Sequence, residues 1–521
     1  MSVRTLILYS APKSGAGDAW MTFLPVGLGY LQAALKGKGH PCRLANLSGK
    51  SRKEVLDYLR TQEAEVIGVS MFTFNRKRSV ELLKLAREAH PRAVLLAGGP
   101  HPTHLAWEVF EECPALDAIV KGEGEGPLLN VVEHLQAGEP WRQTPGLILR
   151  GGENPAQPPL EDLDSLGLPV EHFEADFMDD PERLAYLSSS RGCPATCTFC
   201  NTPEFWGSKI RFRSAASVLR EMALLRERHG LIYFSFRDDT FTARKSRTLD
   251  LAEGIRASHL HPLWNCQSRV NLVDEERLVA LKRAGCEFIQ FGVEHASERV
   301  LQLLDKGVKP DQARRALALT RKVGLNLGIY LITGIPGETW ADVEASAALI
   351  REARPHDVQV APLAVYPGTR LYSRFLEEGR IRRDFFRTSG DAEVFARVDA
   401  HTEKALRLLE REAGRVKPAY TPAEFAAQKK WLGFCAVTNL LCGEAAELAG
   451  RFVEAEDEYL EIVRREPRNP WGYLRLAALR NGQGREKEAQ ADLREVLQLA
   501  PGNPEALRMK ALWSKVIPRT R

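Results

Sequence analysis

Short apolar runs alternate with helix-length stretches through the first 150 residues. Four of these runs end in small or turn-forming residues: TLILYSAP (5–12), AEVIGVSM (64–71), AVLLAGGP (93–100) and LDAIVKGEGE (116–125). Buried strands separated by helices are typical of a parallel sheet that is covered on both faces. The pattern therefore predicts a doubly wound, Rossmann-like α/β domain over residues 1–150, with ligands at the carboxyl ends of its strands.

A second series of strands follows a turn-rich segment, QPPLEDLDSLGLP, which lies in an expected linker over residues 151–182. Strands are predicted at 183–190, 231–236, 262–267, 288–293, 327–333 and 357–361. Amphipathic stretches separate them, for example AASVLREMALLRERHG (215–230), whose apolar residues recur at helical spacing. Strands that alternate with helices predict repeated β/α units, here over residues 183–375.

The chain beyond residue 375 changes character. Residues 376–433 are rich in Arg, Glu and Phe and are expected to form a helical extension. Over residues 434–521 a repeat is visible, since Gly450 and Pro467 recur as Gly484 and Pro501, each 34 residues later. This period resembles the tetratricopeptide (TPR) repeat, although two similar helical hairpins would give the same pattern. Such a short array is expected to pack on the preceding domain or to bind a partner peptide.

Composition sets the broad class of the protein. A length of 521 residues predicts two to four domains, and 44% hydrophobic with 27% charged residues is typical of a globular protein. The net charge of +4 gives no support for a nucleic-acid partner. We expect a cytoplasmic protein with no membrane span, because no signal peptide and no apolar run of membrane-spanning length is found.

Three of the nine cysteines form a cluster, SRGCPATCTFCNTP, with Cys193, Cys197 and Cys200 in a C-x3-C-x2-C spacing. The other six are scattered, so a disulfide framework is not expected. A structural zinc site would need a fourth protein ligand. A redox Cys-x-x-Cys pair would leave one of the three cysteines unexplained. Three buried structural cysteines are a further alternative, but they would not require this particular spacing. A 4Fe–4S cluster held by three thiolates keeps one iron open for a ligand that is not protein.

The triplet, with Phe199 ahead of its last cysteine and a strand before it, resembles the signature of the radical S-adenosylmethionine (SAM) superfamily. The resemblance implies a partial TIM-type barrel of about six β/α units, SAM bound to the open iron, and reductive cleavage to a 5′-deoxyadenosyl radical. It also implies that Phe199 packs near the adenine.

Polar residues at the ends of the predicted strands match the SAM contacts of this superfamily. Asp238 and Asp239 follow the second strand, Ser268 and Arg269 the third, and Glu294 the fourth. By resemblance they would receive the ammonium, carboxylate and ribose of SAM, and the turn 334–339 would lie beside the adenine. Each also has a plain structural interpretation, as a helix cap or a solvated charge.

Residues 1–150 resemble the cobalamin-binding domain that precedes the barrel in one branch of the superfamily. The D-x-H-x-x-G pattern, whose histidine binds cobalt in other cobalamin proteins, is absent, so cobalamin is expected without a protein histidine on cobalt. A Rossmann-like domain that binds no corrinoid is the alternative. The expected cobalamin contacts follow three strands: Ser70, Gly98, Gly99, Pro100, His101, Gly122, Glu123 and Gly124.

Together these features predict a cobalamin-dependent radical SAM enzyme that methylates an unactivated carbon of an organic substrate. A reductant such as flavodoxin or ferredoxin is expected, and the TPR-like segment is a possible site for a protein partner. A cyclase or rearrangement enzyme of the same architecture, and a non-catalytic sensor, are the alternatives.

Overall fold

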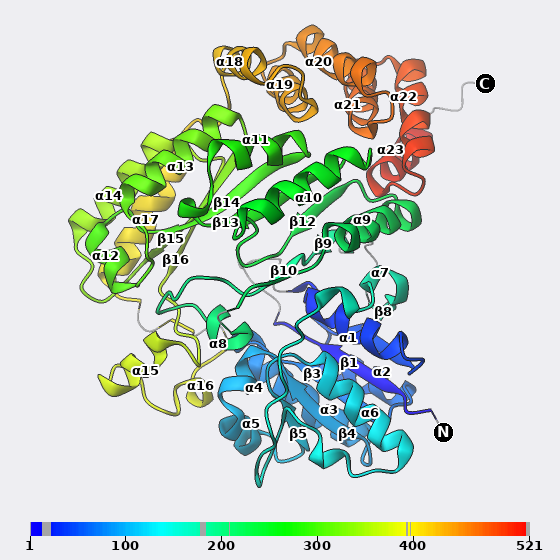
Figure 1. Cartoon of the computed structure of the whole chain (residues 1–521), viewed down its shortest axis with the longest axis vertical. Coiled ribbons are helices and arrows are strands. Elements are labelled where there is room, and N and C mark those ends of the chain that lie inside the picture. Colours follow the sequence, from blue (N-terminus) through cyan, green and yellow to red (C-terminus); the bar gives the residue numbers. More distant parts are fainter. Residues whose placement is uncertain are drawn as a thin grey trace.

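A computed structural model describes residues 2–12, 22–177, 184–207, 209–391, 394–395 and 398–516. Its amino-terminal part contains an eight-stranded sheet in the order β7-β6-β5-β4-β3-β1-β2-β8, in which β6 is antiparallel to both of its neighbours and the other strands run in one direction (Figure 1). The strands are β1 (Thr5–Tyr9), β2 (Cys42–Asn46), β3 (Val66–Ser70), β4 (Val94–Gly98), β5 (Ala118–Val120), β6 (Leu147–Leu149), β7 (Gly152–Glu153) and β8 (Ala175–Asp176).

Helices cover both faces of this sheet, because strand residues alternate between two apolar cores. In β1, Leu6 and Leu8 face one core, whereas Ile7 and Tyr9 face the other. The first core takes residues from α2 (Arg52–Thr61), α3 (Arg76–Ala89) and α5 (Ala106–Glu112), and the second from α1 (Val26–Lys36) and α6 (Glu125–Ala137). The four strands predicted from the apolar runs are present, which confirms the α/β prediction.

Part of the expected linker belongs to this sheet. Strand β8 pairs with β2, with Leu44 opposite Ala175, and α7 (Pro169–His172) lies against α1, where Gly29 leaves room for Pro169. Residues 178–183 lie outside the described residues, and with them the start of the strand predicted at 183–190.

The second sheet has six parallel strands in the order β16-β15-β14-β13-β12-β9 (Figure 1). They are β9 (Tyr186–Leu187), β12 (Tyr233–Phe236), β13 (Leu263–Ser268), β14 (Cys286–Glu294), β15 (Asn326–Thr333) and β16 (Asp357–Pro362). One face is apolar and packs on α9 (Ala215–His229), α10 (Lys245–Ala257), α11 (Glu275–Arg283), α12 (Glu298–Leu303), α13 (Pro310–Val323), α14 (Trp340–Ala353) and α17 (Ala400–Arg415). Each predicted strand therefore corresponds to an observed one.

The other face of this sheet is polar. Gln267 donates to the Tyr330 hydroxyl over 3.2 Å, and that hydroxyl donates to Gln290 over 3.0 Å. These side chains lie on three adjacent strands and are only partly buried. A core face would be filled by branched apolar residues, so this face is built to meet water or a polar ligand.

Further helices follow the second sheet: α15 (Arg370–Glu377), α16 (Phe385–Thr388), α18 (Pro422–Leu432), α19 (Ala436–Leu448), α20 (Phe452–Arg465), α21 (Pro470–Gly482), α22 (Glu486–Leu499) and α23 (Pro504–Val516). Helix α22 begins 34 residues after α20, and α23 begins 34 residues after α21, as the repeat in the sequence indicates.

The carboxyl-terminal helices pack on the second sheet. Ile232 and Leu263, which precede or begin strands of that sheet, share an apolar core with Tyr459 and Trp471. The Asn503 amide donates to the Gly230 carbonyl over 2.9 Å. The expectation that this segment packs on the preceding domain is met. Among the described residues, no helix is long and apolar enough to cross a membrane.

Candidate functional site

The three clustered cysteines lie on one loop between two short antiparallel strands, β10 (Ser190–Arg191) and β11 (Arg211–Phe212). Gly192 begins the loop with a φ of 97°, and a side chain there would lie 3.1 Å from the Lys209 carbonyl oxygen. Only glycine fits such a position without strain. The glycine ahead of the triplet is therefore required by the geometry of the loop.

The thiols have polar neighbours from the second sheet. The sulfur of Cys193 lies 3.2 Å from the Thr240 hydroxyl, and the Arg269 guanidinium lies 3.4 Å from the sulfur of Cys197. Cys193 and Cys197 are buried, whereas Cys200 is half-buried. In the parts of the chain that the structure describes, no three His, Cys, Asp or Glu side chains converge on a point where one metal ion could sit. A 4Fe–4S cluster binds each thiolate at a different iron, so the three thiols of this loop are a donor set that fits such a cluster.

The two aspartates predicted as SAM contacts lie in different places. The Asp238 carboxylate is buried and accepts hydrogen bonds from the backbone amide of Ser189 at 3.1 Å and from its hydroxyl at 2.9 Å. Burial raises its pKa, which the bonds from Ser189 and Ser190 oppose. Asp238 therefore joins β12 to the start of the cysteine loop, and only Asp239 lines the cavity described below.

The remaining SAM candidates lie at the ends of β13 and β14, and one of them, Arg269, contacts Cys197. Glu294 pairs with Lys306 over 2.6 Å, and the Lys306 carbonyl accepts a hydrogen bond from Arg269. Ser268 bonds to the Thr242 hydroxyl. Glu294 has a φ of 65°, which is rare for a residue with a side chain, and the pairing of β14 with β15 shifts register beside it. Backbone strain of this kind often marks a functional position.

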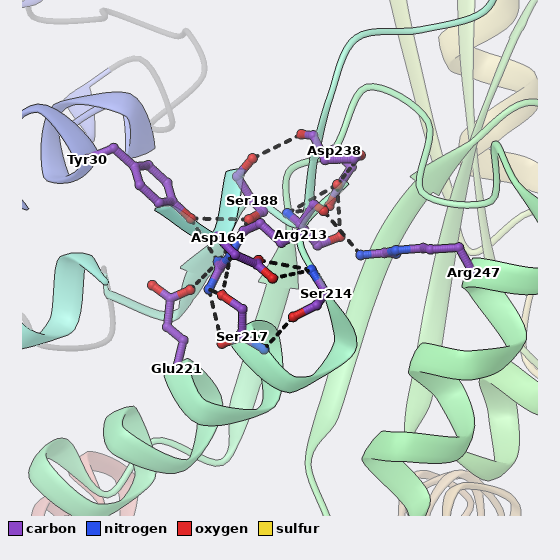
Figure 2. Close-up of polar contacts among 11 residues, drawn as sticks. Tyr30, Asp164, Ser188, Arg213, Ser214, Ser217, Glu221, Asp238 and Arg247 are labelled. Carbon is purple, nitrogen blue, oxygen red and sulfur yellow. Dashed lines mark hydrogen bonds and ion pairs between the residues drawn. The ribbon is translucent and has the colours of Figure 1, made fainter. Parts of the chain in front are cut away.

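A buried polar network supports the base of the cysteine loop (Figure 2). The Arg213 guanidinium pairs with Glu221, donates to the Tyr30 hydroxyl over 2.9 Å and donates to the Ser188 carbonyl over 3.1 Å. Arg247 donates to the Ser189 carbonyl over 3.1 Å. Tyr30 lies on α1, so this network joins the eight-stranded sheet and its helices (the first sheet unit) to the six-stranded sheet and its helices (the second sheet unit). This connection was not predicted, because Tyr30 lies 183 residues before Arg213 along the chain.

A cavity of about 610 Å³ lies between the carboxyl ends of the first sheet and the cysteine loop. Seven of the eight expected cobalamin residues line it: Ser70, Gly98, Gly99, Pro100, Gly122, Glu123 and Gly124. The opposite wall contains Phe199, Cys200, Trp206 and Asp239. The structure thus brings seven expected cobalamin residues to one cavity with Cys200 and two of the expected SAM residues, Phe199 and Asp239, whereas Ser268, Arg269 and Glu294 are not in its lining.

The eighth residue, His101, is placed elsewhere. It is buried outside the cavity lining, where its Nδ1 atom lies 3.2 Å from the Thr73 hydroxyl and its ring packs edge-on against Phe386 at 5.5 Å. Burial lowers its pKa to about 3, so the imidazole is neutral. No histidine is among the described residues that line the cavity. The prediction of His101 as a cavity contact is not met, because the helix that begins at Pro100 turns its side chain away.

The lining of the cavity suits a broad ligand that carries amide groups around its edge. Gly122 has a φ of 72°, and nothing lies within 4 Å of the position that a side chain would take, so its backbone faces open space. Leu28, Leu96 and Leu128 supply an apolar inner wall. Glu123, in contrast, uses its carboxylate within the protein, where it pairs with Arg191 and Arg211. The sequence could not reveal these partners, which follow Glu123 by more than 60 residues.

Comparison with known proteins connects this site to characterised families. A model described as the radical SAM superfamily matches residues 187–350, and one described as a B12 binding domain matches residues 18–132. An uncharacterised methyltransferase of Pyrococcus horikoshii is 30% identical over 390 residues, which cover 71% of this chain and 83% of the relative. An anaerobic magnesium-protoporphyrin IX monomethyl ester cyclase of Rubrivivax gelatinosus is 27% identical, over 71% of this chain and 69% of the relative.

Solved structures share the fold. The radical SAM methyltransferase TsrM of Kitasatospora setae, with cobalamin and a 4Fe–4S cluster bound, superposes with a TM-score of 0.64 at 17% identity, over 88% of this chain and 99% of that chain. The cobalamin-dependent radical SAM enzyme OxsB, with aqua-cobalamin and SAM bound, gives a TM-score of 0.55 at 16% identity, over 100% of this chain and 82% of that chain.

Proposed function

The chain belongs to the radical SAM superfamily and carries a B12-binding domain, and on that premise we propose that it methylates an unactivated carbon of an organic substrate. It is an enzyme whose cofactors are a 4Fe–4S cluster, SAM and cobalamin. One observation carries the proposal: a single cavity has the glycine-rich strand ends of the B12-binding domain on one wall and Cys200 on the other. Cofactors held on these two walls would act on the same substrate atom.

In this proposal Cys193, Cys197 and Cys200 hold the cluster. When bound, the cluster supplies the electron that cleaves SAM, and cobalamin supplies the methyl group. Arg269, which contacts Cys197, and Glu294, which is paired with Lys306, would orient SAM through its carboxylate and ribose, because bidentate and charge-assisted hydrogen bonds fix such groups well. Ser268, Asp239 and Phe199 complete the SAM site. Asp238 is assigned a supporting role, since its carboxylate is already bonded within the protein.

Cobalamin would bind with no protein histidine on cobalt. Support comes from the cavity lining, which has no histidine among its described residues, and from the neutral His101 packed on Phe386 behind it. The backbone at Gly98, Gly99 and Gly122 would contact the corrin amides, and the apolar wall would take the nucleotide tail. Burial between the two sheets would keep water away from reactive species.

The remaining assignments follow the same scheme. We place a cobalamin domain at residues 1–150, a linker at 151–182, a partial barrel at 183–375, a helical extension at 376–433 and TPR-like repeats at 434–521. A low-potential protein such as a flavodoxin or ferredoxin would supply electrons. The 34-residue offset between paired helices supports the TPR assignment, and a partner peptide is its expected ligand.

The products formed from SAM test the function without knowledge of the substrate. Anaerobically reconstituted protein with cobalamin, SAM and a one-electron reductant should release both 5′-deoxyadenosine and S-adenosylhomocysteine, the second because cobalamin takes its methyl group from SAM. A cyclase of this architecture would give 5′-deoxyadenosine without S-adenosylhomocysteine. A sensor would give neither product.

A further inference from the structure

Four buried charged side chains join the first sheet unit to the base of the cysteine loop. Glu123 and Glu125 lie where β5 leads into α6, and Arg191 and Arg211 lie on β10 and β11. Arg191 pairs with Glu123 over 2.8 Å and with Glu125 over 2.5 Å, and Arg211 pairs with Glu123 over 2.5 Å. We name these four residues the interdomain clamp.

The two arginines lie opposite each other on the paired strands from which the cysteine loop extends. In the register of β10 and β11, Arg191 is directly opposite Arg211, so two positive charges are held side by side. Like charges in that arrangement destabilise a strand pair. The two carboxylates neutralise them, and the Arg191 guanidinium also stacks on Trp206 at 5.0 Å. The short hairpin therefore depends on carboxylates from the other sheet unit.

The side chains of the interdomain clamp are almost fully removed from water, and this makes the geometry of their pairing specific. The exposed fractions of the side chains are 7% for Arg191, 1% for Arg211 and 10% for Glu123 and Glu125. A buried charge without a partner is strongly destabilising, so each of these charges must stay paired in the folded protein. Two arginine forks that bind two carboxylates fix both distance and orientation. The loop that the clamp closes, residues 192–210, contains all three cluster cysteines.

We infer that the interdomain clamp positions the cluster loop against the B12-binding edge, and that Glu123 is a positioning residue rather than a cobalamin contact. The inference rests on the proposed function, because the distance that the clamp sets is the one between cluster and cobalt. Glu123, Glu125 and Arg191 line the cavity that both cofactors would share, so a displacement of the loop changes the shape of that cavity directly.

The test is Glu123→Gln, alone and combined with Glu125→Gln, in the full-length protein loaded with cluster and cob(II)alamin. Pulsed electron paramagnetic resonance reports the magnetic coupling between the reduced cluster and cob(II)alamin. The wild type should give one well-defined coupling, and the double variant should lose it while iron and cobalamin contents stay at wild-type levels. Without cofactors, hydrogen exchange within residues 184–212 should be faster in the double variant.

A matched control separates positioning from general stability. Asp492→Asn removes a carboxylate with the same 10% exposed fraction, paired with Arg480 over 2.9 Å inside the carboxyl-terminal helices, and should leave the coupling unchanged. If the double variant keeps the wild-type coupling and only unfolds at a lower temperature, the inference is wrong. If Glu123→Gln instead takes up less cobalamin while the molecules that retain it keep the wild-type coupling, Glu123 is a cofactor contact and the inference is wrong. A wild-type chain that takes up no cobalamin would overturn the proposed function and the inference together.

Discussion

Glutamine in place of Glu294 removes one charge from the proposed SAM site and keeps the size of the side chain. Glu294 ends β14 in a left-handed backbone conformation, with a φ of 65°, and its carboxylate lies 2.6 Å from the Lys306 ammonium. Because glutamine is nearly isosteric, the backbone strain stays the same in the variant. A change in SAM affinity would then report the lost charge alone.

Two free energies follow from this geometry. A hydrogen bond to a charged group contributes about 1.5–3 kcal/mol, so loss of the bonds from the ribose should weaken SAM binding by roughly ten- to a hundredfold. The Lys306 ammonium, with a side chain only 6% exposed, would also lose its buried partner. An uncompensated buried charge costs about 3–5 kcal/mol, so the free energy of unfolding should fall by up to that amount.

Equilibrium dialysis of SAM against the anaerobically reconstituted protein measures the affinity. Glu287→Gln is the matched control, since Glu287 is a partly buried carboxylate at the opposite end of β14, bonded to the Tyr233 hydroxyl at 2.7 Å and to the Asn326 amide at 3.1 Å. It should destabilise the protein without changing SAM affinity. Equal affinities in wild type and Glu294→Gln, or equal losses in both variants, would refute the placement of Glu294 at the ribose.

Further predictions concern the cluster, the cobalt ligand and a buried lysine. Cys197→Ala should lower iron content and abolish 5′-deoxyadenosine formation, whereas Cys286→Ala, at the buried start of β14, should retain the cluster. SAM cleavage by the Cys197 variant would contradict the ligand assignment. The paramagnetic resonance of bound cob(II)alamin should lack nitrogen splitting from a protein histidine in both wild type and His101→Gln, and splitting that the variant loses would show an axial bond. Burial lowers the pKa of Lys282 from 10.5 to about 8, so between these values the unfolded state binds more protons and stability rises with pH. Lys282→Met should remove up to about 3 kcal/mol of that rise in the free energy of unfolding, measured by urea unfolding of the cofactor-free protein at pH 7 and pH 10. An equal rise with pH in wild type and variant would contradict the lowered pKa of Lys282.

Features written in consecutive residues were predictable. The cysteine triplet lies on one loop, and the strand-end glycines line one cavity, because parallel strands place their carboxyl ends at the same edge. Strand β2 was not predicted, since the exposed Arg43 interrupts a short apolar run. Strand β8 has only two residues, inside a segment that reads as a linker, and is held by pairing with β2. Such an element is defined by its neighbour and leaves no periodic signal.

Side-chain partners were the least predictable part of the site. Glu123, Asp238 and His101 each follow a strand end, as the sequence predicts for ligand contacts. In the structure, however, each of these side chains is bonded to another part of the protein. Lys306 has no motif that would reveal it, and its role follows only from its contact with Glu294. A sequence shows which residues follow a strand, whereas the direction of a side chain depends on residues far away along the chain.

The packing of the carboxyl-terminal helices on the second sheet has a consequence for synthesis on the ribosome. Ile232 and Leu263 are covered by helices α20 and α21, and the backbone of Asn503 lies so close to Gly230 that no side chain would fit between them. At a synthesis rate of roughly 5–20 residues per second, the ribosome adds Asn503 on the order of 15–50 s after Ile232. During that delay the apolar base of the sheet stays open to other nascent chains. We therefore expect this protein to need chaperone protection late in translation, and chains that stop before residue 450 to aggregate.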